Sequence, residues 1–166
     1  GGAHVHRGAF ARGHALARQG NDYWNDSGGR ICNAMFQSWI VLGLAGLGRT
    51  DEALALNART IAHCRDTGDR FMEPECVRLR GELTLAAQPS DTATAERLLR
   101  EALAIAEAQE ALSWELRAAT SLARLLQSRD RRAEAAACLA PVLERFTEGR
   151  ETPDLRQAGE LLAELA

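Results

Sequence analysis

The chain has 166 residues, a formal net charge of −3 and 46% hydrophobic residues, of which few are aromatic. This length fits one domain that buries roughly 70% of its unfolded surface. A composition rich in alanine and leucine favours closely packed helices over strands. The slightly acidic balance excludes a basic nucleic-acid footprint. Because the chain contains no lysine, a P-loop lysine and a Schiff-base lysine are excluded as well.

The cysteines, targeting signals and apolar runs indicate a cytoplasmic protein. Cys32, Cys64, Cys76 and Cys138 form no CxxC pair, so zinc-knuckle and thioredoxin-like motifs are excluded. Each lies in an apolar helical pattern, which is typical of buried, reduced thiols. No apolar run reaches the roughly 18 residues of a membrane span. The N-terminus lacks the apolar region of a signal peptide, and we expect no membrane partner.

Along the chain, the first predicted helix covers residues 9–18 and stops at Gly20. The next ten residues, NDYWNDSGGR, are polar and rich in turn formers, and they predict a loop. The first hairpin, residues 1–30, is therefore expected to be irregular, with its second helix missing at residues 21–26.

Clearer helix boundaries follow. An apolar helix is predicted over residues 31–47, closed by Gly48. Thr50 is expected to be the N-cap of the next helix, whose first turn is acidic. That helix runs to residue 67, where Gly68 supplies a left-handed stop.

The second half of the chain shows two more hairpins and a final helix. Pro141 is expected to kink one helix, and Thr152 and Pro153 have the N-cap and N1 signature of the last one. The predicted helices cover residues 71–87, 92–108, 112–126, 132–147 and 153–165.

A repeat period near forty residues links these helices. Ala95 recurs forty residues later as Ala135 and is preceded by Ala53 at forty-two. Leu103 recurs as Leu143 and is preceded by Ile61. Paired amphipathic helices at a fixed period are the mark of a stacked helical repeat. We therefore predict an all-α, right-handed solenoid of antiparallel hairpins, with HEAT-like packing as the alternative.

Several segments resemble a family of bacterial multidomain signalling proteins. They are RLRGEL (78–83), LRAATSLARLL (116–126), LAPVLERFTEG (139–149) and TPDL (152–155). In that family an adenylate/guanylate cyclase or other output domain precedes an ATPase module. A C-terminal tetratricopeptide-like (TPR-like) region follows, similar to that of MalT/LuxR-type regulators. The resemblance covers about residues 70–166, and GHALARQG (13–20) more loosely. One departure is Glu110, which stands where the family tends to have glycine.

The resemblance implies a TPR-like superhelix and a cytoplasmic regulatory module without catalytic residues. We expect a single domain over residues 1–166. Its predicted parts are the irregular first hairpin, repeats at 31–68, 70–108 and 111–148, and a capping helix at 153–165.

The first helix of each hairpin usually lines the inner surface of such a stack. We take Gly81 and Ala123 as equivalent packing positions, and this alignment predicts six exposed inner residues. They are Glu75, Arg78, Glu82, Arg117, Thr120 and Arg124. A groove of mixed acids and arginines would bind a charged partner segment through bidentate pairs. The alternative is a solvated face whose ion pairs only link neighbouring helices.

The sequence contains only weak signals for metal binding or catalysis. His4 and His6 would bind a metal only on a strand and with further ligands, so no metal site is expected. His63 and Cys64, with Cys76 nearby, suggest a thiol nucleophile, but adjacent helical residues point to different faces. We therefore expect no enzyme and no cofactor.

Glycine and tryptophan positions are expected to serve packing. Gly43, Gly46 and Gly48 lie in an apolar helix without a preceding strand, so a nucleotide loop is excluded. Trp39 and Trp114 occur at helical core spacing, which favours packing anchors over ligand stackers.

The preferred function is a non-catalytic module that binds a protein or peptide segment on its concave face. The partner is another protein or the chain's own upstream ATPase or cyclase domains, and a homodimer is a further expectation. The alternative is an inducer-sensing domain for a small molecule that controls an attached output domain. A deep pocket lined by Trp39, Arg78 or Arg124 would favour the alternative, whereas a shallow groove would favour a protein partner.

Overall fold

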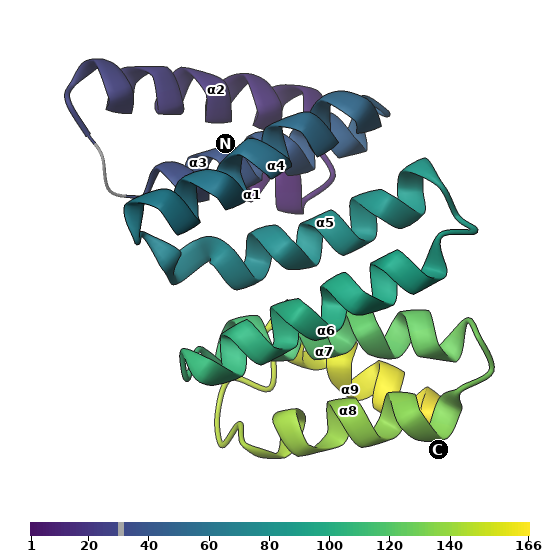
Figure 1. The fold of residues 1–166 in the computed structure, drawn as a ribbon. Helices are drawn as coiled ribbons and strands as arrows, with labels where there is room; N and C mark the ends of the chain where they lie inside the picture. Colours follow the sequence, from purple (N-terminus) through teal and green to yellow (C-terminus); the bar gives the residue numbers. More distant parts are fainter. Residues whose placement is uncertain (30–31) are drawn as a thin grey trace.

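The computed structural model describes residues 1–29 and 32–166, and all regular structure in these ranges is helical (Figure 1). In the described residues, no helix combines the length and hydropathy needed to cross a membrane. The helices are α1 Gly2–His6, α2 Phe10–Asp26, α3 Asn33–Gly46, α4 Thr50–Thr67, the 3₁₀ helix η1 Arg70–Met72, α5 Glu73–Ala87, α6 Thr92–Ala108, α7 Leu112–Gln127, α8 Arg132–Glu144 and α9 Pro153–Leu165.

The helices form two layers. Each helix packs against the next along the chain, so that helical hairpins stack on one another (Figure 1). Helices α1, α3, α5, α7 and α9 also pack against their neighbours within this set, whereas α2, α4, α6 and α8 do so little. The first set therefore lies on the inner side of the curved stack, and we call its members inner helices and the others outer helices. The predicted all-α superhelix of hairpins is confirmed.

The outer helices share one register. Their N-cap residues are Ala9, Arg49, Asp91 and Arg131. Four residues after each cap comes a small, buried residue, and these are Gly13, Ala53, Ala95 and Ala135. At such positions neighbouring helices approach closely: a Cβ at Gly13 would lie 2.8 Å from the Val5 backbone nitrogen. The period that the alanines indicate is thus the period of the outer layer.

Apolar side chains fill the space between the layers. Toward the C-terminus, Leu99, Leu122 and Leu139 are fully buried in one cluster drawn from α6 to α9. A second cluster joins α2 to α5 around Val41 and Leu79. Each such side chain contributes about 1.5–3 kcal/mol of burial free energy, and these clusters hold the hairpins in place.

The first hairpin differs from its prediction. Helix α2 continues through Gly20 to Asp26, so the predicted loop is wrong at residues 21–26. A helical glycine is unfavourable by about 1 kcal/mol, but here α2 packs along α3, and Trp24 lies 6.1 Å from Phe36 between ring centroids. The chain turns instead at Gly28, with φ at 81°. Arg30 of the predicted loop and Ile31, the predicted start of the next helix, lie outside the described residues.

The partner of α2 precedes it in the sequence. The five-residue helix α1 packs on α2 and α3 from the inner layer. The idea of a missing second helix after residue 20 is therefore wrong, because α2 itself is the outer helix of this hairpin. Its polar surface residues are compatible with a helix because one side of α2 faces solvent.

Other boundaries follow the predicted signals with small shifts. Arg49, not Thr50, is the N-cap of α4, because Thr50 already has helical geometry. Gly68 adopts the left-handed conformation, as predicted, and so does Gly48, which was predicted only to close the preceding helix. Helix α8 ends at residue 144, three residues earlier than predicted, and contains Pro141. Glu110 has φ of 54°, so a non-glycine residue occupies the left-handed position of the turn between α6 and α7.

Close packing at Gly43 makes a testable prediction for the first two hairpins. A Cβ there would lie 2.7 Å from the His14 Cβ and 3.1 Å from its Cα. Gly43→Ala should therefore force α2 away from α3 and lower the free energy of unfolding by about 1–3 kcal/mol.

Urea unfolding followed by circular dichroism measures this change. The control is Gly159→Ala in α9, where an added Cβ meets nothing within 4 Å. The control should gain up to about 1 kcal/mol, because alanine favours a helix more than glycine does. Equal effects of the two substitutions would contradict the close approach of α2 and α3.

Candidate partner-binding face

The six predicted site residues lie on two neighbouring inner helices. Glu75, Arg78 and Glu82 share one face of α5, at positions i, i+3 and i+7. The other three lie on α7, which packs directly against α5. The structure therefore brings the two halves of the predicted site together.

The predicted exposure is wrong for half of these residues. Glu75, Arg78 and Thr120 are only 2%, 5% and 7% exposed. The reason is that the inner helices pack against one another, so α7 covers the face of α5 that the sequence suggested would be open. Arg124 is exposed, and Arg117 and Glu82 are partly exposed.

A buried ion-pair network joins the two helices. The Glu75 carboxylate accepts hydrogen bonds from Arg78 Nε at 2.7 Å and from Arg78 Nη2 at 2.9 Å. Arg117 of α7 lies 3.0 Å from the same carboxylate, measured from Nη2 to Oε1. Glu75 thus links an arginine of its own helix with an arginine of the next hairpin.

Ser121 completes the network. Its Oγ accepts a hydrogen bond from Arg78 Nη1 at 3.0 Å and donates one to Glu82 Oε1 at 2.8 Å. The Thr120 hydroxyl donates instead to the Leu116 carbonyl of its own helix. Ser121 was not among the predicted residues, and a serine next to a predicted threonine gives no signal by itself.

Electrostatics keep these buried groups charged. Burial by itself would raise the pKa of Glu75, but the charges of Arg78 and Arg117 and the hydrogen bonds from Arg78 hold that pKa below its usual value. Burial would likewise lower the pKa of Arg78, but Glu75 and Glu82 raise it. Glu75 and Arg78 therefore remain ionised at neutral pH. The ion pairs do link neighbouring helices, as the alternative interpretation held, but at the centre they are buried rather than solvated.

The last helix contributes the edge of this face. Arg117 Nε lies 3.8 Å from Asp154 Oδ2, and Arg124 Nη2 donates to Gln157 Oε1 at 3.1 Å. The Arg117 guanidinium also lies over the Trp114 ring, 5.5 Å from its centroid. Sequence reasoning missed Asp154 and Gln157, because α9 comes beside α7 only in the folded stack.

An apolar hollow of about 120 Å³ lies next to the network. Trp39 and Trp114 pack against core clusters, as predicted, but they also remain partly exposed and line this hollow. Phe71, 48% exposed, lies 6.4 Å from Trp114 between ring centroids. The lining residues are His6, Met35, Ser38, Trp39, Leu42, Phe71, Met72, Glu75, Trp114 and Arg117.

A second, polar hollow of about 80 Å³ lies between α5, α7 and α9. It is lined by Arg78, Arg117, Thr120, Ser121, Arg124, Asp154 and Gln157. Arg117 borders both hollows, so they are neighbours on the inner face. Each is much smaller than the 300–1,000 Å³ that is usual for small-molecule pockets.

The histidines considered for metal binding lie on α1, and the cysteines considered for catalysis lie in the core between α4 and α5. His4 and His6 lie on helix α1 rather than on a strand, and within the described ranges no group of three or more potential ligands could hold a metal. Cys64 and Cys76 are fully buried, and the hydrogen bond that the Cys76 thiol shares with Cys64, together with burial, raises the pKa of Cys76, while the same bond lowers the pKa of Cys64. A thiolate is therefore disfavoured at Cys76. Gly43 and Gly46 contact α2 closely, as expected for packing positions.

Comparison with solved structures supports the fold. Two crystal structures contain the nearly identical TPR-like repeats of a kinesin light chain-like protein from Podosopora anserina, one as a variant. They superpose with TM-scores of 0.66 and 0.65 at 18% and 19% sequence identity. Each comparison covers 98% of this chain and 80% of that chain. No protein-family model and no curated protein matches the sequence. The chain thus has a TPR-like fold.

The central position of Glu75 predicts a large stability effect. Glu75→Gln leaves the charges of Arg78 and Arg117 without their buried partner, so the free energy of unfolding should fall by about 3 kcal/mol or more. Glu82→Gln is the matched control, because that side chain is 42% exposed. It should lower the free energy by about 1 kcal/mol or less, and equal losses in urea unfolding would contradict the central role of Glu75.

The same carboxylate predicts a pH dependence. The pKa of Glu75 is lower in the folded chain than in the unfolded chain. Its stabilising contribution is therefore fully present above the unfolded value of about 4.3 and is lost as the pH falls through the folded value. The difference in unfolding free energy between the parent chain and Glu75→Gln should shrink from pH 7 to pH 3, and a constant difference would contradict this assignment.

Proposed function

We propose that the inner face binds an extended segment of a protein partner and that the chain has no catalytic role. The observation that carries this proposal is the pair of neighbouring hollows on the inner face, which we take together as one shallow groove. The apolar hollow is lined by α1, α3, η1, α5 and α7, and the polar one by α5, α7 and α9. Beneath this groove, the ion pairs of Glu75 fix two hairpins relative to each other. A groove whose floor is already rigid loses little conformational entropy when a partner binds.

The side chains at the rim suit a protein segment. Trp39, Trp114 and Phe71 present partly exposed aromatic surface around the apolar hollow. Tryptophan and arginine are the residues that most often dominate binding energy at protein interfaces. Arg124 and Asp154 are exposed at the neighbouring hollow, so a partner could pair with charges of either sign.

The inducer-sensing alternative gains no support from this face. Hollows of about 120 and 80 Å³ are too small for an enclosed small molecule of ordinary size. Arg78 is directed into its ion pairs with Glu75 and Glu82, so it is not available as a ligand anchor.

The resemblance of residues 70–166 to signalling regulators suggests the biological setting. On that basis we propose a cytoplasmic regulatory module whose partner is a neighbouring ATPase or cyclase domain or a separate protein. The repeats at 31–68, 70–108 and 111–148 would act as one binding unit. A homodimer remains a further proposal, for which the exposed Leu16 and Tyr23 on α2 are candidates.

A peptide-display selection tests the proposal. A random peptide library is selected against the purified chain, and bound peptides are then titrated against variants. Trp114→Ala should weaken the selected peptides at least tenfold, because it removes an aromatic anchor worth about 2 kcal/mol. Arg124→Glu should weaken the binding of acidic peptides specifically.

The control for this experiment is Arg97→Ala on outer helix α6, whose side chain is 66% exposed. It should leave peptide affinity unchanged. Peptides that bind all variants equally, or a selection that enriches no peptide, would overturn the inner-face proposal.

A further inference from the structure

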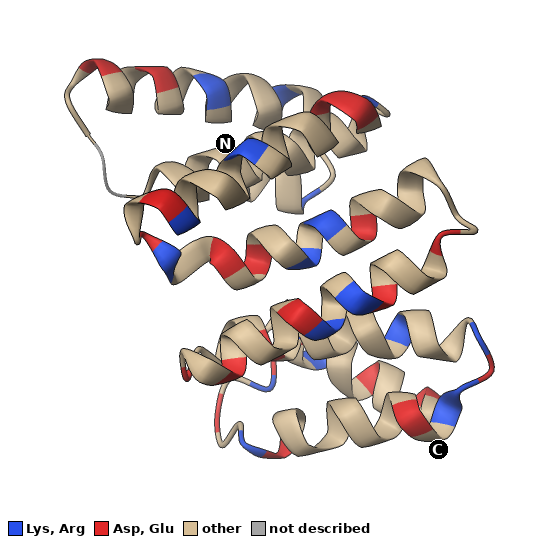
Figure 2. Cartoon of the chain, viewed as in Figure 1, with Lys and Arg blue, Asp and Glu red and all other residues tan. Residues whose placement is uncertain are grey.

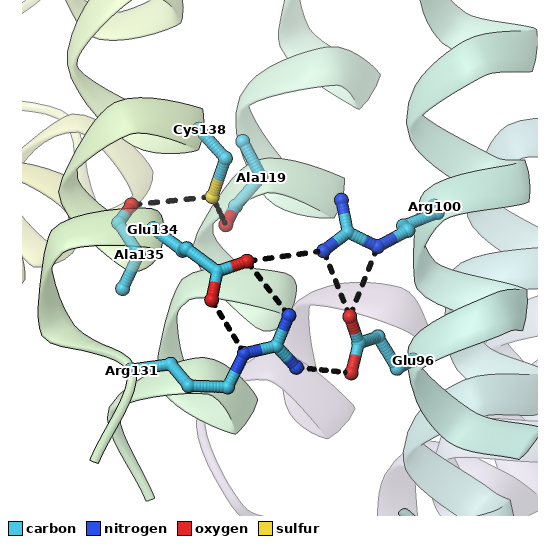
Figure 3. A network of polar contacts seen from close by, with 7 residues as sticks. All are labelled: Glu96, Arg100, Ala119, Arg131, Glu134, Ala135 and Cys138. Carbon is cyan, nitrogen blue, oxygen red and sulfur yellow. Dashed lines mark hydrogen bonds and ion pairs between the residues drawn. The ribbon is translucent and has the colours of Figure 1, made fainter. Parts of the chain in front are cut away.

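The outer layer holds a four-residue charge network that links α6 to the N-terminal end of α8 (Figure 3). Arg131 of α8 donates two hydrogen bonds to Glu134, each 2.7 Å long, and Arg131 Nη1 donates to Glu96 of α6 at 2.7 Å. Arg100 of α6 donates to Glu96 from Nε at 3.0 Å and from Nη2 at 2.7 Å. Two arginines and two glutamates thus balance one another across the groove.

The same groove exists between α2 and α4, eighty-two residues earlier. The shared register of the N-caps aligns Arg49 and Glu52 of α4 with Arg131 and Glu134 of α8. By the same shift, His14 and Arg18 of α2 align with Glu96 and Arg100 of α6. All four earlier residues line one cleft between the two helices.

Half of the network is reproduced in this earlier groove. Arg49 Nε and Nη2 each donate to the Glu52 carboxylate at 2.6 Å, in the same bidentate arrangement as Arg131 and Glu134. Arg18 stands where Arg100 stands in the later groove. Arg18 and Arg49 thus occupy the equivalent sequence positions and line one cleft.

The second carboxylate is missing. At the position of Glu96 the earlier groove has His14, and no residue that the structure describes brings a carboxylate to Arg49 Nη1 or pairs with Arg18. At the four equivalent positions, two arginines and two glutamates become two arginines, one glutamate and a histidine. Asp22 and Arg59 also line this cleft, and among the described residues neither forms an ion pair with Arg18, Arg49 or Glu52. Burial, followed by the charges of Arg49 and Arg18, lowers the pKa of His14, as expected where cations lie close together.

The groove between α4 and α6 shows that this pattern is not general. There, Leu54 and Ala58 occupy the positions of Glu96 and Arg100. That groove lacks both the acid and the arginine, so its charges at these two positions are not unbalanced. Figure 2 likewise shows acidic and basic positions interspersed along the helices rather than gathered in one cationic surface.

The cleft has room for a ligand. It measures about 500 Å³, within the usual range for small-molecule sites. Ile40 and Leu44 of α3, both largely buried, line its floor, while Arg18, Arg49 and Arg59 line its rim. A ligand with a short methylene chain and at least one terminal carboxylate would match both parts.

We propose that the cleft between α2 and α4 binds a carboxylate, held by Arg18 and Arg49 Nη1 where Glu96 lies in the later groove. Guanidinium groups bind carboxylates bidentately, and Arg100 and Arg131 show this arrangement in the same chain. The carboxylate belongs to a small organic acid or to an acidic side chain of a protein. This site lies on the outer layer and is independent of the proposed inner groove.

A binding titration tests the site. Glutarate is titrated at constant ionic strength, and the dissociation constant is read from NMR shifts of the His14 ring. Arg18→Ala should weaken binding at least tenfold, whereas Arg97→Ala, an exposed arginine on α6, should not change it. A blocked Ala-Glu-Ala peptide is the second probe: tighter binding of the peptide assigns the carboxylate to a protein, and tighter binding of glutarate assigns it to a free acid.

Two substitutions that exchange the residues at the equivalent positions 14 and 96 provide the decisive control. His14→Glu supplies the missing carboxylate, so it should raise the thermal midpoint without ligand and abolish the rise in thermal midpoint that glutarate gives the parent chain. Glu96→His should create a new glutarate-responsive site between α6 and α8. The proposal is overturned if neither probe binds, if chloride or phosphate at equal ionic strength gives the same response, or if Arg18→Ala and His14→Glu respond as the parent chain does.

Discussion

Close approach of helices at small residues is the constraint on which the rest of the structure depends. Gly13, Ala53, Ala95 and Ala135 occupy one position in each outer helix and are buried there. A larger side chain at this position would push the layers apart, because protein interiors have few voids to absorb extra volume. The repeat period, the two layers and the alignment of polar groups across grooves all follow from this shared register.

The tight inner layer has a direct consequence for charge. Because α5 and α7 are in contact, acids and arginines on their facing sides become buried and must pair. Glu75 meets this requirement by accepting hydrogen bonds from Arg78 and lying beside Arg117. Pairing stiffens the inner face, and the groups left at its edge, such as Arg124 and Trp114, are the ones available to a partner.

The outer layer shows how repetition can produce a binding site. Where a complete network closes a groove, as between α6 and α8, the arginines are satisfied within the chain. Between α2 and α4, His14 stands in place of the acid Glu96, and Arg49 keeps only its pair with Glu52. A comparison of equivalent positions within one chain is therefore the basis for the carboxylate site proposed in this cleft.

The sequence by itself determined the helical class, the forty-residue period and most helix ends. These depend on local signals: apolar spacing, the left-handed glycines at 48 and 68, and the Thr152–Pro153 start. It failed at residues 21–26, where packing of α2 on α3 outweighs the local preference for a loop. It chose the right site helices but the wrong exposure for Glu75 and Arg78. Only the tertiary structure decided which helix faces become buried, which acids meet which arginines, and how α9 completes the groove, because these depend on contacts between residues far apart in the chain.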